Sequence, residues 1–171
     1  NAVVWPVARK QLAEIVKVIR KCGWTPNVLN PSKPVSSVAE GIRVVRKAAG
    51  SRFINFIAGW AYPDFSVSPM AQLPPDVPKL MFGSTLPDFP GAVGLLAAAS
   101  GTEHVGVRTD RLFAENFARH ADYEDALNAF LNKGTWNKSM PKPIRVAVTE
   151  RNRARARKVK AALRGSGVLT P

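Results

Sequence analysis

The chain contains few cysteine, histidine and aromatic residues. Among its 171 residues one is cysteine, two are histidine, and 8% are aromatic. A single thiol, Cys22, cannot form an internal disulfide, which indicates a reducing compartment and a cytoplasmic protein. The histidines, His104 and His120, do not stand at metal-ligand spacing from a Cys, Asp or Glu, so we interpret both as structural and expect no metal centre within the chain.

Long apolar runs are also missing. The longest are about as long as a strand, whereas a membrane-spanning helix needs about 20 apolar residues. No charged segment followed by an apolar run opens the chain, so no secretory leader is indicated. The sequence therefore predicts no association with a membrane.

Acidic residues are scarce relative to basic ones. The chain has 25 Lys and Arg against 12 Asp and Glu, a formal net charge of +13. The excess lies at the two ends, because residues 1–50 hold nine basic against two acidic residues and residues 142–171 hold nine against one. The middle, residues 51–141, is nearly neutral. Such ends favour an acidic partner: nucleic acid, an anionic surface or a neighbouring subunit.

Apolar segments of strand length alternate with segments of helical period, which is typical of a parallel sheet covered by helices. We therefore predict an α/β fold: an open, doubly wound, mostly parallel sheet, flavodoxin-like or Rossmann-like, with helices on both faces. It would form a single domain over residues 1–165, with 166–171 beginning a linker. The predicted strands are 2–5, 28–29, 53–58, 80–82, 104–107 and 144–148, and the predicted helices are 10–22, 36–49, 91–99, 123–132 and 150–163.

Turn and cap residues mark several of these boundaries. Gly23 and Gly134 stand where helix-ending glycines are expected, and Glu40 lies at capping-box distance from Ser37. The acidic residues at 122, 124 and 125 are explained as the cap and first turn of a helix, with Asp122 as the cap. Residues 61–78 carry five prolines, which predicts a loop with at most a helical turn around Met70 to Leu73.

The stretch from Lys79 to Ala99 is the most informative. It reads as a buried strand broken at Gly83, a loop set by two prolines, and an apolar helix that starts near Gly91. In an open α/β sheet, ligands bind outside the carboxyl end of a strand and beside a helix N-terminus. The stretch therefore marks a candidate site, although its own Ser84, Thr85 and Asp88 are better explained as loop and capping residues than as catalysts.

Common catalytic and phosphate-binding motifs are missing from the sequence. There is no Gly-x-Ser-x-Gly elbow, and the Gly101-x4-Gly106 spacing lacks the Lys and hydroxyl residue that a phosphate-binding loop needs. The glycines at Gly91 and Gly94 do not have the dinucleotide-binding spacing. Cys22, inside a predicted helix with no histidine near it in sequence, is expected to be a small core residue. We assign no catalytic residue within the chain.

The aromatic loop after the strand 53–58 contains Trp60 and Tyr62. Rings at the carboxyl end of a strand can pack on the apolar face of a sugar while their polar edge stays in water. Alternatively, Trp60 seals the end of the core beneath the proline-rich loop. Both interpretations stay open from periodicity alone, and the functional one makes Trp60 and Tyr62 the candidate substrate-binding residues.

The last predicted helix is strongly basic. Arg151, Arg153, Arg155 and Arg157 lie within it, without the interleaved aromatics that stack on bases. Nucleic acid would then be bound through phosphate contacts alone. A solvated helix, or one facing another subunit, is the interpretation favoured, and a basic nucleic-acid-binding module remains the alternative.

Three segments resemble the N-terminal domain of the L-fucose/L-arabinose isomerase family: Gly59-Trp60-Ala61-Tyr62-Pro63, then residues 76–83, then residues 89–99. This family interconverts aldoses and ketoses through an enediol on a divalent metal, usually manganese, whose ligands lie in later domains. The resemblance implies a monosaccharide substrate, a homo-oligomer with pockets shared between subunits, and contact of Trp60 with substrate at a neighbouring subunit. It implies a substrate-wall domain that is inactive alone; a sugar-binding sensor domain of similar architecture is a further alternative.

Overall fold

The computed structural model describes residues 5–59, 62–85 and 91–136. They belong to the first of two compact units, Asn1–Lys138, and the second unit, Ser139–Pro171, lies outside the described residues. The predicted boundary between 165 and 166 stays a prediction. The described elements are α1 (Trp5–Lys21), α2 (Val38–Val45), β1 (Phe53–Ile57), α3 (Asp64–Met70), β2 (Lys79–Ser84), α4 (Gly91–His104), β3 (Asp110–Ala114), a short 3-10 helix (His120–Asp122) and α5 (Glu124–Lys133).

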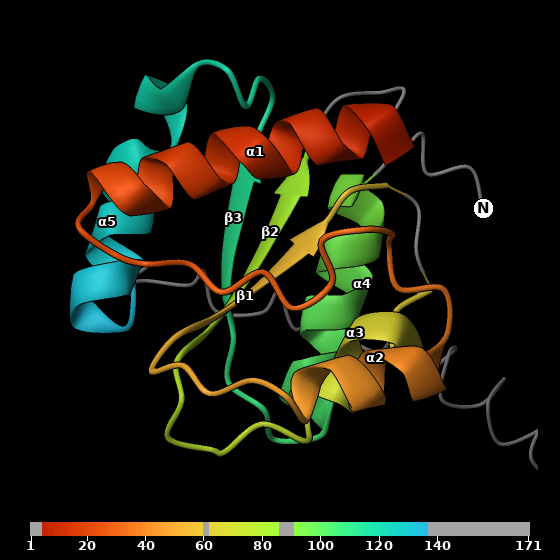
Figure 1. Ribbon diagram of the computed structural model, residues 1–171. Coiled ribbons are helices and arrows are strands. Elements are labelled where there is room, and N and C mark those ends of the chain that lie inside the picture. The colour runs from red at the N-terminus through yellow and green to blue at the C-terminus, as the bar shows by residue number, and fades with distance from the viewer. Residues whose placement is uncertain (1–4, 60–61, 86–90, 137–171) are drawn as a thin grey trace, which may run out of the picture. The chain divides into compact units, whose positions relative to one another are not determined.

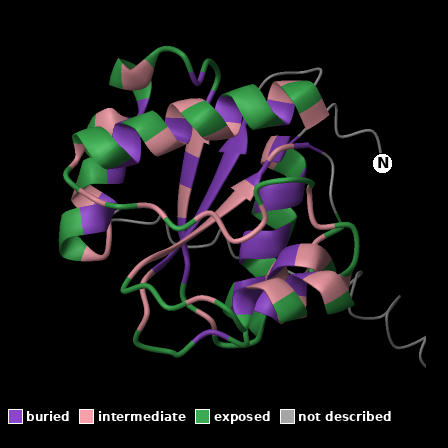
Figure 2. Cartoon of the chain, viewed as in Figure 1, coloured by how far each residue is buried: buried purple, intermediate pink, exposed green. Residues whose placement is uncertain are grey.

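The three described strands form one parallel sheet in the order β1-β2-β3 (Figure 1). Both neighbouring pairs are joined by a crossover that contains a helix, α3 between β1 and β2 and α4 between β2 and β3. The middle strand is buried along its whole length, as Figure 2 shows. A strand buried on both faces has an almost continuous apolar sequence, which explains Leu80-Met81-Phe82.

Helices cover both faces of this sheet, as predicted. Leu80 and Phe82 of the middle strand pack with side chains of α1 and α5, whereas Met81, between them, packs with Leu95 and other residues of α3 and α4. Successive strand residues point to opposite faces, so two separate cores form on one strand. Figure 1 shows α1 and α5 on one side of the sheet and α3 and α4 on the other. The α/β, doubly wound fold is confirmed.

Several predicted caps are present. Gly23 and Gly134 follow α1 and α5 with φ of +84° and +76°, the left-handed region that glycine adopts without strain. The Ser37 hydroxyl accepts a hydrogen bond from the Glu40 N–H at 3.2 Å. The Glu40 carboxylate in turn accepts from Ser36, 2.8 Å from both its N–H and its hydroxyl, so the capping pair closes one residue earlier than a standard capping box.

Two other predictions of local structure are wrong, and a third, the strand 2–5, is contradicted at Trp5. Helix α1 begins at Trp5, so the predicted strand 2–5 ends inside a helix; Pro6 in the first turn needs no hydrogen-bond donor, and residues 2–4 lie outside the described part. Residues 36–49 form a shorter helix that ends at Val45. The proline-rich segment holds α3, because Pro63 precedes it with helical backbone angles.

Two predicted strands are not found where expected. Val28 and Leu29 lie in an irregular segment. Residues 104–107 form the end of α4 and a turn at Gly106, whose φ is +77°. The third strand instead starts at Asp110. It was not predicted because its first two residues, Asp110 and Arg111, are charged, although buried and half-buried positions alternate along the strand. The predicted strand 144–148 and helix 150–163 lie outside the described residues.

Candidate functional site

The carboxyl ends of the three strands meet at one edge of the sheet. Ile57 is opposite Gly83, and Ser84 is opposite Ala114. The ladder extends one step further, because the Thr85 N–H donates to the Ala114 carbonyl at 3.1 Å. This edge is where open α/β sheets bind ligands.

Helix α4 begins directly against this edge. A Cβ placed on Gly91 would lie 2.9 Å from the Ile57 carbonyl oxygen and 3.3 Å from the Ser84 nitrogen. Only a residue without a side chain allows so close an approach of helix to strand ends. The positive end of the α4 dipole therefore lies beside the strand ends, an arrangement that suits oxygen-rich or anionic ligand groups. The order of strand, connection and helix predicted from Lys79 to Ala99 is present. Strand β2 continues through Gly83, so the predicted break there is wrong, and Ser84 is a buried strand residue and not a loop residue.

Of the two candidate substrate-binding residues, the structure describes Tyr62. Its side chain is 57% exposed, and its ring meets that of Phe65 edge to face, with centroids 6.1 Å apart. Tyr62 lies in the connection between β1 and α3, so an accessible aromatic ring follows the carboxyl end of β1. Trp60 lies outside the described residues, and its contact with ligand stays a prediction.

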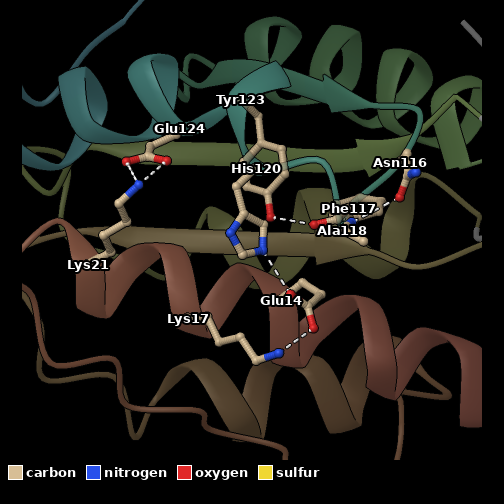
Figure 3. Close-up of polar contacts among 9 residues, drawn as sticks. All are labelled: Glu14, Lys17, Lys21, Asn116, Phe117, Ala118, His120, Tyr123 and Glu124. Atoms are coloured by element: carbon tan, nitrogen blue, oxygen red, sulfur yellow. Dashed lines mark hydrogen bonds and ion pairs between the residues drawn. The ribbon is translucent and has the colours of Figure 1, made fainter.

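A polar cluster links α1 to the segment after β3 (Figure 3). The Glu14 carboxylate contacts His120 Nε2 at 2.8 Å and Lys17 Nζ at 2.6 Å. The hydrogen bonds from Lys17 and His120 lower the pKa of Glu14. Glu14 and His120 are 106 residues apart, so no local sequence signal could have paired them.

The same region contains a buried phenol. The Tyr123 hydroxyl donates to the Phe117 carbonyl at 2.9 Å, and burial raises the pKa of Tyr123 far above its ordinary value. A phenol that stays protonated is a structural donor and not a base. Nearby, Lys21 links α1 to Glu124 of α5, with 2.7 Å between the ammonium and the carboxylate (Figure 3). These contacts fix helices, and they bring no catalytic pair together.

At the amino ends of the strands, two buried polar side chains, Lys79 and Asp110, have structural contacts. Lys79 is 4% exposed, and its ammonium donates to the Pro74 and Val77 carbonyls at 2.7 Å each. Burial lowers its pKa. Asp110 accepts from the Trp136 N–H at 3.1 Å. Lys79 and Asp110 start their strands, so they lie away from the candidate site.

Other predicted roles can be compared with the structure. Asp122 is not the cap of α5: it lies in the 3-10 helix, and Tyr123 is the N-cap residue, without a side-chain hydrogen bond. Glu124 and Asp125 occupy the first turn as predicted. Cys22 is half-buried against the core, which raises the pKa of its thiol.

Three further predictions concern metal ions, nucleic acid and membranes. Within residues 5–59, 62–85 and 91–136, no three His, Cys, Asp or Glu side chains lie close enough together to hold a metal ion. The basic residues Arg151, Arg153, Arg155 and Arg157 are outside these ranges. None of the helices in the described part of the chain is long and apolar enough to cross a membrane.

Comparisons with known proteins give one match. No curated protein and no solved structure matches the chain. A family model, described as L-fucose isomerase, first N-terminal domain, matches residues 8–136, which is more than half of the chain. The matched range includes every described helix and strand except the first turn of α1. The chain therefore belongs to the family of the first N-terminal domain of L-fucose isomerase.

Proposed function

We propose that this chain is the substrate-wall and oligomerisation domain of an aldose-ketose isomerase. The family match over residues 8–136 carries the proposal. The site geometry supports it, because the α4 N-terminus and the strand ends form an edge suited to ligand oxygens, and the described residues at this edge include no catalytic acid-base pair. The chemistry, enediol formation on a metal such as manganese, would be performed by residues outside this chain.

The proposed ligand is a monosaccharide, contacted by Trp60 and Tyr62. The exposed ring of Tyr62 supports this, because an aromatic face packs against the C–H face of a sugar. No observation on the described residues favours the alternative nucleic-acid-binding or sensor functions. A cytoplasmic location is inferred only from the single cysteine.

Oligomerisation is proposed to use the outer face of α4. Val93 and Leu96 on this face are 54% and 49% exposed, although the opposite face is buried in the core. A helix that is apolar on all sides is usually covered on all sides. A second copy of the same chain is the proposed cover, consistent with the pocket sharing that the family resemblance implies.

The substrate contact is tested in the complete isomerase that contains this domain. Trp60→Ala and Tyr62→Ala should each raise KM by about tenfold, roughly 1.4 kcal/mol of lost binding, with kcat within about twofold. Tyr62→Phe keeps the ring and should leave KM nearly unchanged. Unchanged KM in both alanine variants, or lost stability as their only effect, would refute the substrate contact.

A further inference from the structure

Two exposed polar residues continue the strands β2 and β3 at the carboxyl edge of the sheet. Thr85 follows β2, and Glu115 follows β3. The register that places Ser84 opposite Ala114 makes Thr85 and Glu115 the next pair. The hydrogen bond from the Thr85 N–H to the Ala114 carbonyl, 3.1 Å long, continues the parallel ladder to this pair. The two backbones are therefore about 4.8 Å apart, so the two side chains are neighbours.

Both residues lie on the side of the sheet that α4 covers. Phe113 of β3 packs with the core on that side. A Cβ placed on Gly83 of β2 would lie 2.9 Å from the side chain of Leu95 in α4. Side chains alternate along a strand, so the residues two positions further, Glu115 and Thr85, face the same side. A carboxylate and a hydroxyl thus lie next to each other, close to the start of α4.

The connection that carries Glu115 is fixed by the core. Phe117, two residues further, is 3% exposed, and its ring lies 5.5 Å from that of Phe56 and 5.2 Å from that of Phe82, measured between centroids. The Tyr123 hydroxyl also donates to the Phe117 carbonyl (Figure 3). Glu115 is therefore held between the end of β3 and an anchored ring. A side chain on a fixed backbone loses less entropy when it binds a ligand.

Glu115 differs from the other carboxylates in the described part of the chain. The others take part in ion pairs or hydrogen bonds, lie in the first turn of a helix, or are within electrostatic reach of the Lys79 ammonium. The Glu115 carboxylate has no such contact within residues 5–59, 62–85 and 91–136, although the chain has 25 Lys and Arg. It is exposed at the edge where open α/β sheets bind ligands, so it is available to a ligand.

We propose that Glu115 and Thr85 bind adjacent hydroxyl groups of the sugar. This inference rests on the isomerase function proposed above, and it adds polar contacts to the aromatic ones proposed for Trp60 and Tyr62. A carboxylate accepts hydrogen bonds from hydroxyls, and the threonine hydroxyl both donates and accepts, so the pair matches two neighbouring sugar hydroxyls. The α4 N-terminus alone would also attract a phosphate, but the negative charge of Glu115 disfavours one.

The test measures sugar kinetics in the complete isomerase that contains this domain. Glu115→Gln should raise KM by about tenfold or more, because hydrogen bonds to a charged group are the strong ones, and Thr85→Val should raise it by about fivefold. Thr85→Ser keeps the hydroxyl and should restore most of the affinity. Asp76→Asn removes the same charge from an exposed position before β2, at the other end of the strands, and should leave KM unchanged.

Monodeoxy analogues of the sugar, used as substrates or inhibitors, locate the contact. The analogue that lacks the hydroxyl bound by Glu115 should bind wild type and Glu115→Gln almost equally, whereas the other analogues should keep the tenfold difference. An equal difference for every analogue, unchanged KM in Glu115→Gln and Thr85→Val, or lost stability in urea as their only effect would overturn the proposal. If Trp60→Ala and Tyr62→Ala raise KM and these two variants do not, the polar contacts alone are refuted; the reverse result refutes only the aromatic contacts.

Discussion

Gly91 sets how closely helix α4 approaches the candidate site. A Cβ added to Gly91 would lie only 2.9 Å from the Ile57 carbonyl oxygen. Because glycine has no side chain, the helix can begin this close to the strand ends. The neighbouring atoms are backbone, which cannot rotate away as a side chain would. The distance between the α4 N-terminus and the strand ends therefore depends on this one residue.

We expect Gly91→Ala to lower the free energy of unfolding by about 1–3 kcal/mol, because overpacking forces the helix away from the strands. Urea unfolding measures this. Ser100→Ala, at an exposed position of the same helix, should change the free energy by less than about 0.5 kcal/mol. Equal stability of wild type and Gly91→Ala would contradict the close approach.

Glu14 gives the stability a defined dependence on pH. Its pKa is lowered from 4.5, chiefly by the hydrogen bond from Lys17 and then by that from His120. A lowered folded-state pKa means that its contribution is fully present above about pH 4.5 and is lost as pH falls through the folded-state value. Glu14→Gln should therefore be less stable than wild type at pH 6, and the difference should shrink as the pH falls through the folded-state pKa of Glu14.

Thermal unfolding at several pH values measures the effect of Glu14→Gln. Glu103→Gln provides a control, because Glu103 pairs with Arg111 of β3, away from α1. A stability difference for Glu14→Gln that is constant from pH 6 to 3 would refute the ionic role of Glu14.

At the scale of elements, helix α2 depends on the Ser37 cap. Its hydroxyl satisfies the Glu40 N–H, one of the four donors left free at a helix start. Ser37→Ala should cost about 1 kcal/mol in urea unfolding, and Ser37→Asp should recover most of it. If both variants were equally unstable, the loss would come from packing and not from the cap.

A second test at α2 uses the Glu40 carboxyl. Hydrogen bonds from Ser36, backbone and hydroxyl, together with Lys33, lower the pKa of Glu40 to about 2. NMR titration should find this value in the wild type and a higher one in Ser36→Ala. An unchanged pKa in Ser36→Ala would leave the hydroxyl without a role.

The sequence predicted elements best where the signal is local. The buried strand around Leu80, the glycine ends of α1 and α5, and the Ser37 cap depend on neighbouring residues, and all are present. The strand at Val28 failed because a strand needs a partner, which local sequence does not show. Helix α3 was missed because prolines end helices but also begin them.

The candidate site was predictable in position but not in detail. The order of strand, loop and helix from Lys79 to Ala99 was enough to place an edge with a helix start beside it. The Glu14–His120 contact joins segments 106 residues apart and arises from the packing of α1 beside the segment after β3. Distant pairs of this kind follow from the fold and cannot be recognised along the chain.

At the scale of the whole molecule, the proposed self-association depends on the outer face of α4. Leu96→Glu adds a charge to this face, so it should convert the assembly to monomers in sedimentation velocity. Ala13→Glu, exposed on α1, should leave the assembly unchanged. If Leu96→Glu remained oligomeric, the interface would not lie on the outer face of α4.

The central claim is that this domain contributes a wall to a sugar isomerase without performing the reaction. Its most direct test is an aldose-ketose isomerisation assay of the folded 171-residue chain alone, with manganese and L-fucose or L-arabinose. The account predicts no conversion above the protein-free control, because no described residues form a metal site or a catalytic pair. Metal-dependent turnover by the isolated chain would contradict it.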